Sequence, residues 1–228
     1  MRNKTVFKSL LAGLAILAIT TGLTSCKNND VDDTGTVNLK VVNASPGAAP
    51  QGFYLANSTV VQGGLSFGKA SDYIVTNSGN NLEVQFRNNG SASPYATGNF
   101  DFEKGRYFSI FLAGQGQTAR IKVFKDDITA PASGQVKVRF IHLSDAAPEQ
   151  VDIRRGSGDN LVVNLKRDEA SNYVTVAPGI LSLDVYATGQ SNSLGKFDLT
   201  ALLPDKIYTV FVTGSTTSDI KVHQVVYN

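Results

Sequence analysis

The chain has 228 residues, with 21 Lys or Arg, 19 Asp or Glu, 2 His and 1 Cys. A formal net charge of +2 gives no basic field of the kind that binds nucleic acid, so we expect no nucleic-acid partner. One cysteine excludes an internal disulfide, and two histidines on separate segments do not form the clustered pattern of a zinc site. We therefore expect no metal and no cofactor.

Residues 1–25 have the pattern of an export signal. Arg2, Lys4 and Lys8 form a basic leader, and the apolar run over residues 10–23 is shorter than the roughly 20 residues that span a membrane. Removal of this leader takes away three cations and no acid, so the formal charge changes from +2 to −1. The slight basicity of the whole chain therefore belongs to the leader.

The leader ends in Leu-Thr-Ser-Cys at residues 23–26, and Cys26 is the only cysteine. This tetrapeptide resembles the lipobox of bacterial lipoproteins, which implies cleavage between Ser25 and Cys26 and a diacylglyceryl group on the Cys26 thiol. The alternative is a plain secretory signal with an incidental cysteine. Since several acyl chains hold a protein firmly in a bilayer, we expect a lipid anchor in the bacterial outer membrane, facing either the cell surface or the periplasm.

Residues 26–36 are polar and acidic, which is typical of a flexible tether. Asp30, Asp32 and Asp33 suggest a calcium loop as an alternative, but the glycine and the distant glutamate of an EF-hand are missing. Acids placed just after a lipidated cysteine also resemble a signal for outward display in some Gram-negative bacteria. We interpret the segment as a tether.

Residues 37–125 and 136–228 read as two copies of one pattern, because five short segments recur in the same order about 100 residues apart. The matching segments are 37–43 with 136–142, 70–73 with 170–173, 98–102 with 195–199, 108–114 with 208–214, and 121–123 with 220–222. Two domains follow, with residues 126–135 as the linker. We expect residues 128–135 to leave the domains some freedom.

The repeated segments alternate apolar and polar residues with period two, as at Val37, Leu39 and Val41. This alternation predicts strands with one face on a core. Several such strands in each copy, separated by Gly, Asn, Ser and Pro clusters, predict an all-β protein of two tandem antiparallel β-sandwich domains, immunoglobulin-like in kind.

The turn after the first strand of each copy is the most distinctive motif. Residues 43–50 read Asn-Ala-Ser-Pro-Gly-Ala-Ala-Pro, and residues 142–148 read His-Leu-Ser-Asp-Ala-Ala-Pro. This turn resembles the signature of the bacterial envelope family called domain of unknown function 4397, in which an Asn or His precedes Ser-Pro-Asp-Ala-Pro. The resemblance implies a β-rich, often duplicated fold with no established activity, and it supplies no catalytic residues.

Three residues are candidates for binding. Tyr95 ends the polar loop 88–95 and is expected to be an exposed ring, while His142 and Asp145 belong to the second turn. The same turn residues also suit a structural role, because Ser and Asp side chains accept hydrogen bonds from nearby backbone N–H groups. Tyr73 and Tyr173, at matching positions, are expected to pack inward with their hydroxyls bonded to backbone.

The sequence thus predicts a lipid-anchored envelope protein that is not an enzyme and binds a glycan or an envelope or host protein through its domain-end loops. One alternative is a periplasm-facing structural subunit of an envelope assembly. The other is a hydrolase that uses His142 and Asp145, although no Gly-x-Ser-x-Gly elbow accompanies them.

Overall fold

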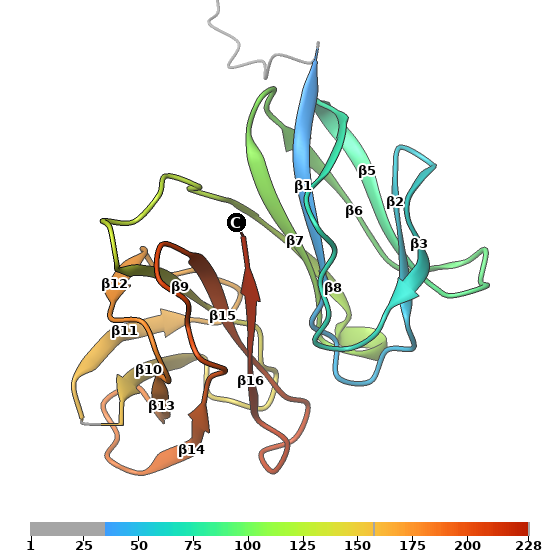
Figure 1. The fold of residues 1–228 in the computed structure, drawn as a ribbon. Helices are drawn as coiled ribbons and strands as arrows, with labels where there is room; N and C mark the ends of the chain where they lie inside the picture. The colour runs from blue at the N-terminus through green and yellow to red at the C-terminus, as the bar shows by residue number, and fades with distance from the viewer. Residues whose placement is uncertain (1–34, 157, 228) are drawn as a thin grey trace, which may run out of the picture.

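The computed structural model describes residues 35–156 and 158–227. The first sandwich contains two four-stranded sheets, and η1 (Gly116–Thr118) joins β7 to β8 (Figure 1). The sheet that faces the second sandwich is called the inner sheet. It has the order β4 (Ile74–Asn77), β1 (Thr36–Asn43), β7 (Tyr107–Ala113) and β8 (Arg120–Lys125). The outer sheet has the order β3 (Ser58–Leu65), β2 (Gln51–Leu55), β5 (Gly79–Asn88) and β6 (Pro94–Phe102).

The second sandwich repeats this strand order, strand for strand. Its inner sheet has the order β12 (Val174–Val176), β9 (Val136–His142), β15 (Ile207–Thr213) and β16 (Lys221–Val226). Its outer sheet has the order β11 (Asn160–Lys166), β10 (Gln150–Arg155), β13 (Ser182–Ala187) and β14 (Ser193–Asp198). The predicted all-β fold of two tandem sandwiches is confirmed.

One strand pair in each inner sheet is parallel, β1 with β7 and β9 with β15, while the other pairs between these strands are antiparallel. Parallel neighbours need a long crossover, which the intervening outer sheet provides. Alternation within a strand carries no information on the direction of its neighbour, so this detail was not accessible from the sequence.

The inner strands are buried on both faces. In β15, Tyr208, Val210 and Val212 point into the core of the second sandwich, whereas Ile207 and Phe211 point into a separate apolar cluster between the sandwiches. That interdomain cluster combines side chains from both inner sheets. Its buried members are Val42, Ala44, Phe111, Ala113, Ile141, Leu143, Ile207, Phe211, Val225 and Tyr227.

The interface contradicts the expected freedom of the linker. Asp126, the first residue of the predicted linker, is buried and forms an ion pair with Arg139 of β9 at 2.6 Å. The inner sheets therefore face each other through apolar side chains and a buried ion pair, and the prediction that residues 128–135 leave the domains free is wrong.

Candidate functional site

His142, at the end of β9, is completely buried. Its Nε2 lies 2.8 Å from the carbonyl oxygen of Pro148, and its Nδ1 accepts a hydrogen bond from the backbone N–H of Ser144 at 3.3 Å. These partners fix the neutral ring with the proton on Nε2. Burial lowers the pKa of His142 below its ordinary value. Both ring nitrogens are engaged, so the expectation of a binding histidine at the rim is wrong.

The equivalent residue of the first sandwich, Asn43, makes the same two kinds of bond. Its Nδ2 donates to the carbonyl oxygen of Leu65 at 2.9 Å, and its Oδ1 accepts from the backbone N–H of Ser45 at 3.1 Å. Asn and His can both offer one donor and one acceptor. The position thus builds the turn, together with Ser144, whose Oγ accepts the backbone N–H groups of Ala146 and Ala147.

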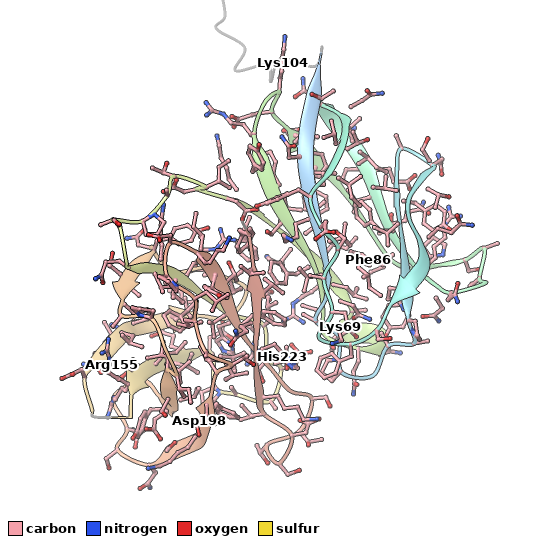
Figure 2. All side chains as sticks on the ribbon, in the orientation of Figure 1. Lys69, Phe86, Lys104, Arg155, Asp198 and His223 are labelled. Atoms are coloured by element: carbon pink, nitrogen blue, oxygen red, sulfur yellow. The ribbon has the colours of Figure 1, made fainter. Side chains whose placement is uncertain are left out.

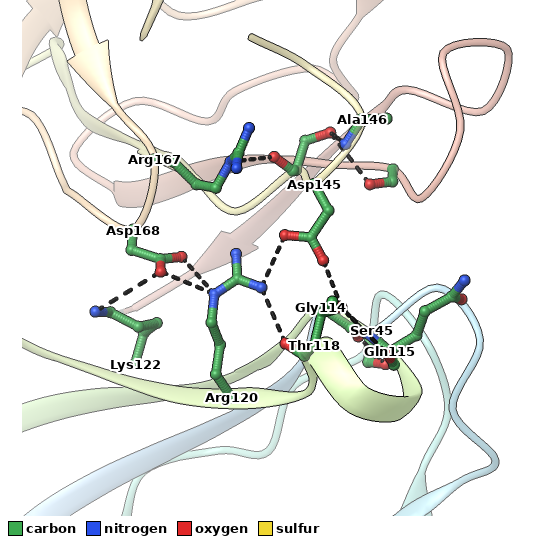
Figure 3. A network of polar contacts seen from close by, with 12 residues as sticks. Ser45, Gly114, Gln115, Thr118, Arg120, Lys122, Asp145, Ala146, Arg167 and Asp168 are labelled. Atoms are coloured by element: carbon green, nitrogen blue, oxygen red, sulfur yellow. Dashed lines mark hydrogen bonds and ion pairs between the residues drawn. The ribbon is translucent and has the colours of Figure 1, made fainter. Parts of the chain in front are cut away.

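Asp145 reaches across to the first sandwich (Figure 3). Its carboxylate accepts a hydrogen bond from Thr118 Oγ1 at 2.7 Å and pairs with Arg120 Nη1 at 2.8 Å. Arg120 Nε also bonds Asp168 at 2.8 Å. Asp145 therefore joins the two sandwiches, whereas His142 bonds within its own turn. The two side chains have separate partners, so they do not form the acid and base pair that the hydrolase alternative requires.

Tyr95 lies at the start of β6 and is half-buried. Its ring packs against the core of the first sandwich, and its hydroxyl accepts a hydrogen bond from the backbone N–H of Gly116 at 2.9 Å. The ring closes over η1 instead of projecting from the loop. The prediction of an exposed stacking ring at this position is therefore wrong.

Ser25, Cys26 and the tether residues 26–34 lie outside the described residues, so cleavage and lipidation stay predictions. Within residues 35–156 and 158–227, no helix is both long and apolar enough to cross a membrane.

A cleft between the sandwiches offers a different candidate site. It has a volume of about 670 Å³ and lies between β8, the start of β9 and the segment before β12. Its lining combines two rings with hydroxyl, amide, ammonium and carboxylate groups from both sandwiches. The residues are Val123, Phe124, Lys125, Asp127, Lys137, Arg139, Ala170, Ser171, Asn172 and Tyr173.

The floor of the cleft is a buried polar network centred on Asp126. Its carboxylate accepts hydrogen bonds from Arg139 Nη2 at 2.6 Å, Ser109 Oγ at 2.7 Å and the Tyr73 hydroxyl at 2.8 Å. Burial raises the pKa of Asp126, while the charge of Arg139 opposes that rise. Tyr73 packs inward as expected, but at the interface and with a carboxylate as its partner. The network fixes Arg139 beneath the cleft.

The walls carry groups that remain closer to solvent. Lys137 Nζ pairs with Asp127 at 2.5 Å and lies 4.8 Å from the centroid of the Tyr173 ring. The hydrogen bond from Lys137 lowers the pKa of Asp127 to about 2. Asn172 is exposed beside them. Such a surface can offer donors and acceptors to a polar ligand around a partly aromatic wall.

Sequence reasoning missed this cleft. The available signal was in residues 136–142, where the adjacent apolar residues Phe140 and Ile141 break the alternation and indicate a strand buried on both faces. Arg139 in such a strand has to find a buried partner. Nothing in the sequence names Asp126 as that partner.

The fold and the cleft define an all-β protein of two packed sandwiches with a polar interdomain site. The family model described as domain of unknown function (DUF4397) matches residues 37–154, and this chain belongs to that family. The match covers the first sandwich and extends into β10 of the second.

No curated protein is significantly similar in sequence. Among solved structures, CBMbc of family CBM26 from Eubacterium rectale Amy13K, in complex with maltoheptaose, is 9% identical over 82% of this chain and 96% of its own, with a TM-score of 0.28. A structure described as alpha-glucan binding by a streptococcal virulence factor is 12% identical over 82% of this chain and 95% of its own, with a TM-score of 0.27. Scores of this size assign no ligand to this chain.

Proposed function

We propose that this chain is a lipid-anchored, non-enzymatic binding protein of the bacterial envelope, with two copies of the family domain, and that its interdomain cleft binds a glycan. The observation that carries the proposal is the cleft itself. Its volume of about 670 Å³ suits a small ligand, and both sandwiches contribute polar groups to its walls.

The chemistry of the lining favours an oligosaccharide. Sugar rings present hydroxyl groups around their edges and C–H groups on their faces, which match polar side chains beside aromatic ones. Asn172 and Ser171 provide amide and hydroxyl groups, and Phe124 provides an apolar surface. Lys125, Lys137 and Arg139 are each paired with an acid, namely Glu103, Asp127 and Asp126, so every cation of the lining is paired and neutral sugars are the favoured class.

Titration of the protein comprising residues 27–228 with acidic and neutral oligosaccharides tests this proposal. Because one neutral hydrogen bond contributes about 0.5–1.5 kcal/mol, Asn172→Ala should weaken binding about threefold to tenfold. Asp72→Ala, at the matching position of the first sandwich and outside the cleft, is the control and should leave binding unchanged. No saturable binding, or equal losses in both variants, would contradict the cleft as the site.

The non-enzymatic part is supported by His142, whose two ring nitrogens are already bonded within the turn. Ester and glycoside substrates should give no turnover that His142→Asn removes. Turnover that disappears in this variant, with the fold retained, would restore the hydrolase alternative.

The anchor is tested separately by protease treatment of intact cells that carry a C-terminal tag, with Cys26→Ser as the unanchored control. Loss of the tag on intact cells would support outward display. Protection until the outer membrane is opened would instead favour the periplasm-facing structural subunit.

A further inference from the structure

The second sandwich has a cation at a position that the first sandwich fills with a core leucine. On β2, Leu55 is paired with Val84 and buried in the first core, and the corresponding residue on β10, paired with Leu183, is Arg155. Residues Ile153 and Val151, two and four positions earlier on β10, point into the second core. Because side chains alternate along a strand, Arg155 leaves the strand on the core side of its sheet.

Arg155 lines a cavity of about 440 Å³ at the edge of the second sandwich, on the side away from the first (Figure 2). Its Nε is buried and has no hydrogen-bond partner among the described residues. Apart from Arg155 and the Ser182 hydroxyl, the lining side chains are aliphatic, and backbone contributes the remaining polar surface. The other lining residues are Gly156, Val176, Ala177, Pro178, Ile180, Leu181 and Ser182.

An exposed apolar surface borders the cavity. Gly179 and Leu202 pair in an isolated antiparallel bridge, with two backbone hydrogen bonds of 2.8 Å. Leu202 is buried, and the residues next to Gly179 and Leu202 along each chain segment point the other way, toward solvent. Among them, Ile180 is 74% and Leu203 56% exposed. Pro178 is exposed on the same face. Apolar side chains therefore lead from solvent to the mouth of the cavity.

We propose that this cavity, which we call the Arg155 pocket, binds an aliphatic monocarboxylate. The apolar walls would take the hydrocarbon chain, and the Arg155 guanidinium would bind the carboxylate, for which its fork of N–H groups is geometrically suited. A neutral aliphatic ligand would leave the Arg155 Nε unpaired. The negative charge of the carboxylate is therefore what makes the pocket prefer a fatty acid anion over a neutral ligand of the same length. The pocket does not share a residue with the interdomain cleft, so the two proposals stand or fall independently.

Titration of residues 27–228 with decanoate and with decanol tests the pocket. Decanoate should bind saturably and at least about tenfold more tightly than decanol, since charge-assisted hydrogen bonds contribute about 1.5–3 kcal/mol. Arg155→Leu, which installs the residue of the first sandwich, should abolish this preference while leaving decanol binding intact. Arg155→Lys should retain part of it.

Arg154→Leu is the matched control, because Arg154 is the next residue on β10 and stacks on Tyr186 outside the pocket, 4.0 Å from its ring centroid. It should keep the preference for decanoate. Backbone resonances of residues 176–182 should shift on titration of the unaltered protein, which locates the ligand even where a variant fails to fold. Absence of saturable decanoate binding, equal affinity for the two ligands, or shifts confined to other residues would overturn the proposal.

Discussion

Asn43 and His142, the last residues of β1 and β9, form the same two kinds of hydrogen bond. Asn43 and His142 both accept the N–H of the serine two positions later and donate to a backbone carbonyl group. Because neither strand could end in a tight turn with these buried groups unpaired, the position requires a side chain with both a donor and an acceptor. Asn43 and His142 thus each build a turn.

The buried histidine predicts a pH effect on stability. Burial lowers the pKa of His142 from the ordinary 6.5, so below about pH 6.5 the unfolded chain binds more protons than the folded one, and stability falls on acidification until the folded-state pKa is reached. His142→Asn should reduce the loss in urea midpoint between pH 7.5 and 5.5. His223, whose pKa burial also lowers, should supply a remaining part. Equal losses with and without His142 would contradict this.

Arg139 and Asp126 form a pair whose members depend on each other. Their side chains are 4% and 0% exposed. Arg139→Met should destabilise the protein by about 3–5 kcal/mol, because the Asp126 charge is left buried and unpaired. The double variant Arg139→Met with Asp126→Leu should recover much of this loss in equilibrium urea unfolding.

The exposed pair of Arg106 with Glu103 provides the matched control for that experiment. Arg106→Met should change the unfolding free energy by less than about 1 kcal/mol. A double variant no more stable than Arg139→Met alone would show that the loss arises from packing and not from an unpaired charge.

At the scale of the element, β7 and β15 each contribute side chains both to the core of their own sandwich and to the interdomain cluster. Phe111 and Phe211 occupy equivalent positions, paired with Val42 and Ile141 respectively, and their ring centroids are 5.4 Å apart across the interface. Contact between equivalent residues is the property of an isologous interface, here within a single chain. These strands therefore read as nearly continuous apolar runs.

Truncation of an interface ring should cost as much as truncation of a core residue. Phe211→Ala should lower the unfolding free energy by about 3–5 kcal/mol, although Phe211 points away from the core of its own sandwich. Val163→Ala on β11, at a 52% exposed position, should change it by less than about 0.5 kcal/mol. A small effect of Phe211→Ala in urea unfolding would mean that the interface opens readily.

The last strand of each sandwich, β8 and β16, differs in register from the sequence match between residues 121–123 and 220–222. The match aligns Ile121 with Ile220, but Ile121 pairs with Leu112 and the residue opposite the equivalent Val212 is Val222. The alignment is therefore displaced by two residues. A displacement of two preserves which face is apolar, so hydrophobic patterning alone did not reveal it.

At the scale of the whole molecule, the interface resembles a symmetric dimer whose ionic contacts are asymmetric. Lys40 of β1 is equivalent to Arg139 of β9, and both lie near tyrosine rings of the interface. The strand register makes Asp126 equivalent to Tyr227, so Arg139 meets a carboxylate where Lys40, 5.8 Å from the Tyr227 ring centroid, meets a ring. Among the described residues, the ion pair and the cleft above it therefore lie on one side of the interface.

Because apolar packing and the ion pair join the sandwiches, heating should unfold both in one cooperative transition. The combined variant Phe111→Ser and Phe211→Ser, which places hydroxyls in the interdomain cluster, should divide the calorimetric profile into two transitions. Two transitions in the unaltered protein would contradict strong coupling between the sandwiches.

The sequence by itself determined the all-β class and the tandem organisation, because alternation with period two and recurrence along the chain are local properties that survive without coordinates. It also singled out the matching turns at residues 43–50 and 142–148, and it predicts the export signal and anchor at Cys26. Tyr95, His142 and Asp145 were chosen for their chemistry, but each is engaged in packing or bonding that depends on distant residues. The interdomain cleft and the Arg155 pocket were decided only by the tertiary structure. Both depend on which faces of separate sheets meet, and that follows from long-range packing and not from the pattern of any one strand.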